Sequence, residues 1–258
     1  MELYPYFIIG LTGLIIGSFL NVVIYRVPLN LSLVFPGSHC PSCNHAILWY
    51  HNVPLWGYLL QRGKCVHCHK NISCTYPLVE FVSALVLCLM YWQFGHSVLF
   101  YKVSFLTLMM FVLASIDYRF HLIPDKVLLF SFPFAFLFTG LQGRDPLISG
   151  GLGFIVGGAG MFIIAVIGRI AYKKDAMGGG DIKLAALLGL FLGWEELLFT
   201  LFTAFLLMTV IGWIGIAVRK IQRGSEIPMA PFLTAAVIAC IFFEHQILHW
   251  YIDLIGGH

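Results

Sequence analysis

Charged residues are scarce in this chain. Of its 258 residues, 15 are Lys or Arg and 12 are Asp or Glu, so only 10% carry a charge, whereas soluble domains average about 25%. Hydrophobic residues make up 60% of the sequence, against about 45–50% in such domains. This composition excludes an ordinary cytosolic enzyme, a disordered chain and a nucleic-acid-binding protein that relies on a basic surface. It predicts an all-α polytopic membrane protein.

Long apolar runs account for most of the sequence. A helix that crosses a bilayer needs about 20 mostly apolar residues, and we expect about eight such helices. The predicted spans are residues 6–25, 77–95, 99–116, 127–142, 150–170, 183–194, 197–218 and 230–250. Gly13 and Gly17 give the first span a small-xxx-small face for close packing. This span follows Glu2 rather than a basic segment and lacks a cleavage site, so we interpret it as a retained helix and not a signal peptide.

The basic residues predict the orientation of these spans. With eight crossings, the segments 26–76, 117–126, 171–182 and 219–229 lie on one side of the membrane. Eleven of the 15 Lys and Arg residues lie in these segments, and Arg169 and Lys183 lie at the adjoining ends of spans. Thirteen therefore fall on that side, and only Lys102 and Arg144 fall on the other. Because basic loops stay in the cytoplasm, we predict that this side is cytoplasmic and that the N-terminus faces outward.

Two cysteine pairs lie in the predicted cytoplasmic segment 26–76. They are Cys40-Pro-Ser-Cys43 and Cys65-Val-His-Cys68, with 21 residues between the pairs. This spacing is typical of a tetrahedral Cys₄ zinc site, in which each pair presents two thiolates from a tight turn. Structural disulfides are the alternative, but they are rare in the cytoplasm.

The two cysteine pairs form a small internal repeat, since both read C-x-x-C-x-x-x-I. We therefore expect two similar zinc knuckles, with Ile47 and Ile72 packed behind them. Nearby histidines leave open whether one of them replaces a cysteine as a ligand. They are His39, His45, His67 and His69.

Carboxylates at the ends of spans are functional candidates in a chain this poor in charge. Six lie on or near the predicted cytoplasmic side: Glu80, Asp117, Asp125, Asp175, Asp181 and Glu226. Asp117 ends the third span, and Asp181 directly follows three glycines. Two carboxyls held close together can share a proton and activate water, which is aspartyl protease chemistry. From these residues alone, pairing with Arg119, Lys126 or Lys183 at the lipid headgroups is a slightly better explanation.

Motifs along almost the whole chain resemble those of the type IV prepilin peptidases, bacterial inner-membrane aspartyl proteases of the GxGD class. The motifs lie at 17–28, 36–43, 52–54, 63–65, 76–80, 117–125, 178–183 and 227–232. So many motifs in the same order are highly specific, and they favour a catalytic role for the aspartates over pairing at the headgroups.

The resemblance implies a function for most of these motifs. Asp117 and Asp181, the latter in Gly178-Gly-Gly180-Asp181-Ile-Lys183, are the expected catalytic pair. Asp125 is expected to start a helix, and Glu80 to support the site. Proteins of this family cleave a basic leader from prepilins and pseudopilins on the cytoplasmic side of the inner membrane.

Many members of the family also methylate the new N-terminal residue with S-adenosylmethionine. The resemblance associates Gly63 and Lys64 with this activity. The expected domains are a first helix (1–25), a zinc module (26–76) and a peptidase domain (77–258). The expected cofactors are structural zinc and S-adenosylmethionine. The expected partners are prepilins or pseudopilins and membrane lipid, with no nucleic acid.

The chain departs from the family pattern in two places. Residues 73–77, Ser-Cys-Thr-Tyr-Pro, lack the arginine that usually precedes Tyr-Pro, and residues 228–231, Pro-Met-Ala-Pro, replace Pro-Phe-Gly-Pro. We expect neither departure to touch the aspartate pair. From helix ends alone, Asp181 at the positive start of its helix is the predicted base, and Asp117 at the negative end of its helix is the predicted acid.

Two other functional classes remain open at this point. A proton-coupled transporter requires carboxylates in mid-span, whereas the motif carboxylates lie at span ends. A scaffold that uses the zinc module to bind partners predicts that the aspartates are dispensable for pilin processing.

Overall fold

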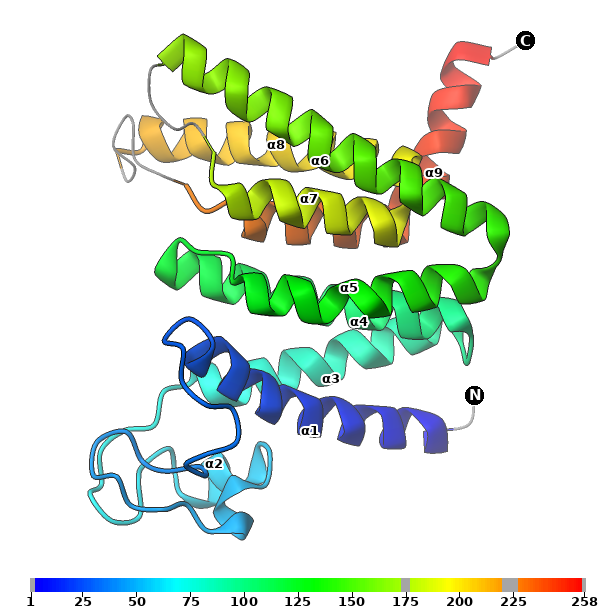
Figure 1. Cartoon of the computed structure of the whole chain (residues 1–258). Helices are drawn as coiled ribbons and strands as arrows, with labels where there is room; N and C mark the ends of the chain where they lie inside the picture. The colour runs from blue at the N-terminus through cyan, green and yellow to red at the C-terminus, as the bar shows by residue number, and fades with distance from the viewer. Residues whose placement is uncertain (1–2, 173–176, 220–226, 257–258) are drawn as a thin grey trace. The chain divides into compact units, whose positions relative to one another are not determined.

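The computed structural model describes residues 3–172, 177–219 and 227–256, and the regular elements in these ranges are helices. The prediction of an all-α fold is therefore confirmed. The chain divides into two compact units, residues 1–100 and 101–258 (Figure 1).

The first unit contains a helical pair and a small loop-rich module. Helices α1 (Leu3–Arg26) and α3 (Thr75–Phe94) pack against each other, and the module between them carries η1 (Trp49–Asn52) and α2 (Trp56–Leu60). A Cβ added at Gly13 would lie 2.5 Å from the Cα of Ala84, and one at Gly17 would lie 2.6 Å from the Cα of Glu80. The predicted close-packing face of the first helix is thus confirmed.

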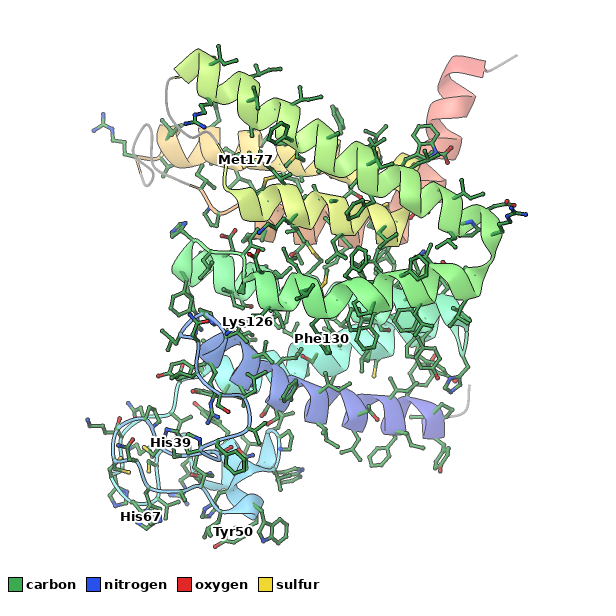
Figure 2. All side chains as sticks on the ribbon, viewed as in Figure 1. His39, Tyr50, His67, Lys126, Phe130 and Met177 are labelled. Carbon is green, nitrogen blue, oxygen red and sulfur yellow. The ribbon has the colours of Figure 1, made fainter. Side chains whose placement is uncertain are left out.

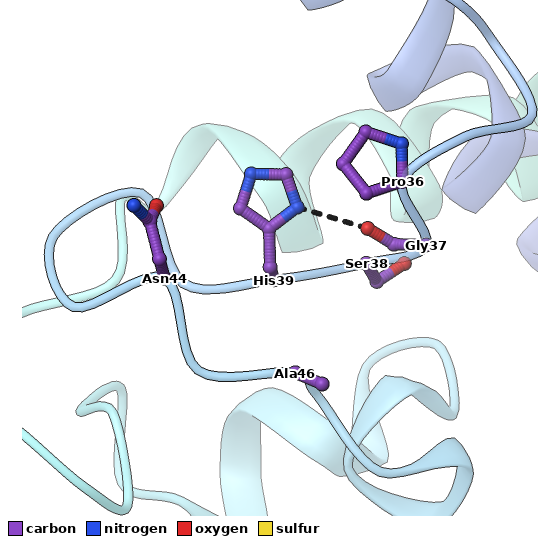
Figure 3. Close-up of a pocket in the computed structure, with 6 residues that line it drawn as sticks. All are labelled: Pro36, Gly37, Ser38, His39, Asn44 and Ala46. Atoms are coloured by element: carbon purple, nitrogen blue, oxygen red, sulfur yellow. Dashed lines mark hydrogen bonds between the residues drawn. The ribbon is translucent and has the colours of Figure 1, made fainter.

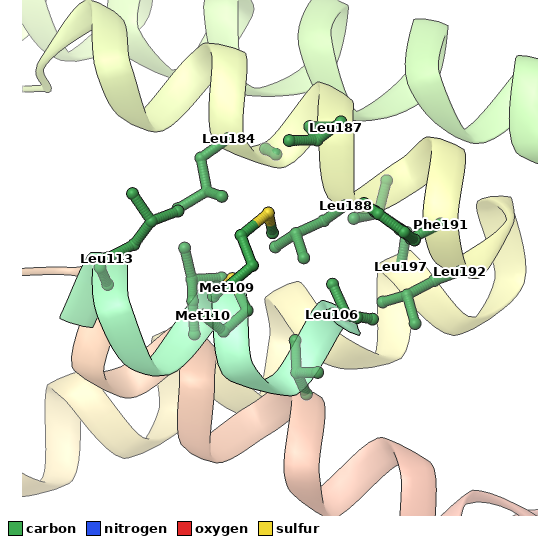
Figure 4. Close-up of a cluster of buried hydrophobic side chains, with 14 of the residues drawn as sticks. Leu106, Met109, Met110, Leu113, Leu184, Leu187, Leu188, Phe191, Leu192 and Leu197 are labelled. Carbon is green, nitrogen blue, oxygen red and sulfur yellow. The ribbon is translucent and has the colours of Figure 1, made fainter. Parts of the chain in front are cut away.

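The second unit is built around a short buried helix. It contains most of α4 (Val98–Phe120), then α5 (Asp125–Gln142), α6 (Arg144–Tyr172), α7 (Gly179–Leu192), α8 (Trp194–Ala217) and α9 (Ala230–Gly256). Every residue of α7 from Leu184 to Leu192 is buried. Its leucines and Phe191 meet Leu106, Met110 and other apolar side chains of α4 (Figure 4).

Small residues bring α6 close to α7. A Cβ added at Gly153 would clash with the carbonyl of Gly189, and one at Gly157 would clash with the carbonyl of Ala185. The two backbones can approach this closely only because glycine has no side chain. The resulting contact fixes α7, and with it Asp181, at the centre of the unit.

Five helices among the described residues are long and apolar enough to cross a membrane: α1, α3, α4, α6 and α8. Each of the eight predicted spans coincides with a helix, but eight crossings are not confirmed. Helix α7 has only 14 residues, so it extends about 21 Å, less than the roughly 30 Å of the hydrocarbon core. The hydrophobicity of the sequence predicts that this segment is shielded from water. It does not distinguish shielding by lipid from shielding by neighbouring helices, and here neighbouring helices bury the segment.

Candidate active site and cysteine cluster

Asp117 lies in the last turn of α4 and is only 6% exposed. Its Oδ2 accepts a 2.9 Å hydrogen bond from the backbone N–H of Ala230, the first residue of α9. The same two helices are joined further along by Thr234, whose hydroxyl donates to the carbonyl of Met110 at 3.0 Å. Asp117 is therefore at the end of one helix and also at the positive start of another.

This contact corrects one of the predictions from the sequence. The departure at residues 228–231 was expected not to touch the aspartate pair, yet the Ala230 amide holds Asp117. The donor is a backbone N–H group, which any residue except proline can supply, so the side chain at position 230 does not reveal this role. The only signal in the sequence is a proline-bounded turn directly before an apolar helix.

Asp181 lies in the first turn of α7, which begins after Gly178. Burial and the nearby charge of Asp117 raise the pKa of Asp181 from 3.8 to about 6, although the backbone of Gly178 acts in the opposite direction. Asp181 thus lies at the start of its helix, as the sequence predicted. The backbone at the positive end of α7 lowers the pKa of Asp181 by less than burial and the charge of Asp117 raise it. The structure brings the two predicted catalytic carboxyls into one electrostatic environment.

The glycines before Asp181 differ in what surrounds them. A Cβ at Gly180 would lie 2.9 Å from the Cβ of Ile123, in the turn that follows Asp117. A Cβ at Gly178 would lie 3.4 Å from Oδ2 of Asp181, and a Cβ at Gly179 would meet nothing within 4 Å. Gly180 therefore allows the start of α7 to seat against the turn that carries Asp117.

Asp125 and Lys183 form an ion pair beside this turn. Lys183 Nζ lies 2.8 Å from each carboxylate oxygen of Asp125, the first residue of α5. The prediction that Asp125 starts a helix is confirmed. Both side chains are more than half exposed, and exposed pairs contribute only about 0–1 kcal/mol. Lys183 is thus engaged by Asp125, which counts against the alternative in which it pairs with Asp181. Asp175 and Glu226 lie outside the described residues.

The four cysteines of the two pairs form one cluster. All four sulfur atoms lie within 4.8 Å of one another, with Cys40 and Cys68 at 3.8 Å and Cys43 and Cys65 at 4.0 Å. A zinc ion with four Zn–S bonds of about 2.3 Å requires sulfurs about 3.8 Å apart. The donor set therefore fits zinc.

The two cysteine knuckles have the same backbone geometry, as their repeat predicted. Asn44 and His69 adopt positive φ angles of 54° and 55°, and their N–H groups donate to the carbonyls of Cys40 and Cys65 at 2.8 and 2.9 Å. The expectation that both isoleucines pack behind the knuckles is wrong for Ile47, whose side chain is 37% exposed.

The nearby histidines do not join the metal-ligand cluster in the described part of the chain. The rings of His45 and His67 contact each other at an interplanar angle of 37°, and His39 contacts the carbonyl of Gly37 through Nδ1. Figure 2 shows His39 and His67 on the module. His39 also lines an open pocket of about 350 Å³ with Pro36, Gly37, Ser38, Asn44 and Ala46 (Figure 3).

The residues associated with methylation have structural surroundings of their own. Gly63 has a φ of +68°, and a Cβ there would lie 2.9 Å from the hydroxyl of Tyr58, while Lys64 is exposed. Glu80 is buried, and its Oε2 accepts a 2.8 Å hydrogen bond from the N–H of Leu55. Glu80 thus holds the module to α3 within the first unit, whereas Asp117 and Asp181 belong to the second.

Comparisons with known proteins agree with this arrangement. Residues 11–94 match the bacterial peptidase A24 N-terminal domain, and residues 104–213 match the type IV leader peptidase family. The chain is 34% identical to a prepilin leader peptidase/N-methyltransferase of Bacillus subtilis strain 168, covering 97% of this chain and 99% of the relative. It is 33% identical to a protein of the same name from Neisseria gonorrhoeae, over 87% and 85% of the two chains. No solved structure matches the chain.

The packing of Gly180 on Ile123 predicts opposite outcomes for two neighbouring substitutions. Gly180→Ala has to displace the start of α7 from the turn after Asp117, and a displacement near 1 Å costs about 10²-fold in activity. Gly179→Ala places its methyl group in open space and retains activity. Hydrolysis of a substrate peptide by the two purified variants measures the difference. Equal activity of the two variants would contradict this account of Gly180.

The cysteine cluster predicts that substituting a cysteine inside it removes zinc and that substituting one outside it does not. Cys65→Ser removes one of four ligands, so we expect the purified variant to lose its bound zinc. Cys74→Ser, the matched control, removes an exposed cysteine of the same module that lies outside the cluster and leaves the zinc content unchanged. Elemental analysis of both variants decides. Full zinc content in Cys65→Ser would show that the cluster is not the site.

The raised pKa of Asp181 predicts that its charge destabilises the folded protein. The pKa of Asp181 in the folded protein is about 6, above the usual 3.8. The destabilisation of the folded state is therefore absent below about pH 4 and fully present above about pH 6. After discounting for partial exposure, Asp181→Asn should raise the free energy of unfolding at neutral pH by about 1–2 kcal/mol.

Denaturant unfolding in detergent micelles, followed against pH, measures this gain in stability. The exposed Asp145 supplies a control variant, Asp145→Asn, which should show no gain. A destabilised Asp181→Asn variant at neutral pH would contradict the prediction.

Proposed function

Because the chain belongs to the type IV prepilin leader peptidase/N-methyltransferase family, we propose that it removes the basic leader of prepilins or pseudopilins and methylates the new N-terminal residue. The observation that carries the peptidase function is the pair of carboxyls at the end of α4 and the start of α7, coupled closely enough for the charge of Asp117 to raise the pKa of Asp181.

The proposed topology has eight crossings, an outward N-terminus and an active site at the cytoplasmic face of the bacterial inner membrane. It is supported by the thirteen basic residues that eight crossings place on one side. The short α7 fits this topology because other helices rather than lipid surround it. The proposed division of labour assigns residues 1–25 to a first helix, 26–76 to the zinc module and 77–258 to the peptidase.

The contacts of the two carboxyls reverse the roles inferred from helix ends. Asp117, which accepts the Ala230 N–H, takes the role of base, whereas Asp181, whose pKa is raised, retains its proton more readily and is the acid. Asp117 takes a proton from water, and the resulting hydroxide adds to the scissile carbonyl carbon as Asp181 protonates the carbonyl oxygen. The tetrahedral intermediate then collapses: Asp117 gives its proton to the leaving amine as the C–N bond breaks, and one hydroxyl of the intermediate returns its proton to Asp181, which restores both carboxyls to their starting states.

The zinc module serves the methyltransferase in this proposal. Cys40, Cys43, Cys65 and Cys68 hold a structural zinc ion, which compensates for a module too small to build a core. S-adenosylmethionine supplies a methyl group that is electrophilic enough for transfer to an amine. Gly63 and Lys64 are the residues proposed to take part, since they form the turn that leads into the second cysteine pair.

Leader cleavage tests the peptidase assignment. Asp117→Asn and Asp181→Asn should each abolish cleavage of a prepilin in membranes, by about 10³-fold or more, because the two groups act as a unit. Asp145→Asn should cleave normally. Both active-site variants should still insert and bind zinc, which separates loss of chemistry from loss of fold. Cleavage by both variants would favour the scaffold or transporter alternatives.

The role of the Ala230 amide is tested separately. Ala230→Pro removes the N–H that Asp117 accepts, at a first helical position that tolerates proline, and should reduce cleavage about 10²-fold with little change in the substrate concentration for half-saturation. Ala230→Gly keeps the donor and should remain active. Full activity of the proline variant would show that the hydrogen bond does not matter for catalysis.

A further inference from the structure

The small helix α2 exposes an apolar surface that neither the peptidase nor the zinc cluster uses. Trp56, Leu59 and Leu60 are 64%, 63% and 67% exposed, and their i, i+3, i+4 spacing places them on one face of the helix. Leu48 and Trp49, just before and at the start of η1, are 49% and 81% exposed. We call these five side chains the α2 surface.

The opposite side of α2 is fixed to the rest of the module. Gly57 is buried, and a Cβ there would clash with the carbonyl of His51. The hydroxyl of Tyr58 lies 3.2 Å from the sulfur of Cys74, next to the start of α3. The helix therefore has a defined orientation, with its large apolar side chains on the unattached face.

The buried Glu80 sets the depth of α2 along the candidate membrane span α3. It accepts the N–H of Leu55, the residue directly before α2, at 2.8 Å. Glu80 is five residues into α3, which begins at Thr75, so the start of α2 lies about 8 Å along the span. Figure 1 agrees: α2 lies level with the last turns of α1, whereas the cysteine loops extend past the end of that helix. Helices that lie in a membrane interface bury their apolar face about 5–10 Å deep.

The net positive charge of the module favours a membrane surface with anionic headgroups. Residues 27–79 contain no Asp or Glu, while Arg62, Lys64 and Lys70 are all exposed. A positively charged segment tethered between two candidate spans is attracted to anionic headgroups by about 1 kcal/mol per basic residue. Tryptophan side chains are also favoured at the headgroup level.

We propose that the α2 surface is an interfacial anchor, which inserts into the headgroup region of an anionic bilayer while the cysteine knuckles remain in the aqueous phase. The anchor fixes the zinc module against the membrane at the level of the second turn of α3. The inference rests on exposure, depth and charge, and it holds whether or not the proposed peptidase activity does.

Photo-cross-linking of the full-length protein in lipid nanodiscs tests this proposal. The variant Trp56→p-benzoylphenylalanine should form adducts with phospholipid. The matched variant Val66→p-benzoylphenylalanine, at a residue of the second knuckle that is also exposed, should not. A lack of lipid adducts at position 56, equal lipid labelling at position 66, or an adduct of position 56 with a second copy or an added prepilin would each overturn the proposal.

The same experiment in discs of mixed phosphatidylglycerol and phosphatidylcholine tests the role of charge. Position 56 should label phosphatidylglycerol preferentially, and Arg62→Gln or Lys70→Gln should each lower that preference about fivefold, equivalent to ~1 kcal/mol. Arg144→Gln, at an exposed residue of the second unit, should leave it unchanged. Equal labelling of the two lipids by the protein with both basic residues would overturn the anionic part of the proposal.

Discussion

The seating of α7 against the turn after α4 is the contact on which the candidate active site depends. A carboxyl at the start of a buried helix can approach a carboxyl at the end of another only if the backbones meet without intervening side chains. Gly180 meets this requirement against Ile123, and Gly153 and Gly189 meet it where α6 crosses α7. The site is thus a consequence of helix packing.

The electrostatics of the pair follow from this packing. Ionisation of both of two nearby buried carboxyls is energetically unfavourable, because the two like charges repel each other. Their surroundings must therefore differ. The Ala230 N–H at the start of α9 donates a hydrogen bond to Asp117, and burial together with the charge of Asp117 raises the pKa of Asp181. A third helix, α9, therefore holds one carboxyl of a pair carried by α4 and α7.

The zinc module solves a different physical problem. Its described residues between α1 and α3 include few buried apolar side chains, and large ones such as Trp49 and Trp56 are exposed. The cluster of four cysteines, whose geometry fits a zinc ion, and the hydrogen bonds of Arg26 to the carbonyls of Ser32 and Pro36 organise the segment in place of a core. The side chains that would otherwise form a core are then free to contact lipid.

Much of this arrangement was predictable from the sequence, for physical reasons that differ between elements. Among the described residues, hydrophobic runs located α1 and each helix from α3 to α9, and the cysteine repeat predicted two equivalent knuckles, because both depend on local spacing. The seating of Gly180, the burial of α7 by protein and the amide of Ala230 depend on which helices become neighbours. The motifs singled out Asp117 and Asp181, but their environment, which divides their roles, becomes visible only once α9 is in place.

Binding of a transition-state analogue is the most direct measurement of the central claim, that Asp117 and Asp181 form one catalytic site. The analogue is a substrate peptide that carries a secondary hydroxyl in place of the scissile carbonyl, as a mimic of the tetrahedral intermediate. The account predicts that the analogue binds the wild-type protein at least about 10²-fold more tightly than the matching substrate peptide, and that either Asp117→Asn or Asp181→Asn abolishes this advantage. An advantage that survives in either variant would contradict the account, because one carboxyl would then recognise the intermediate without the other.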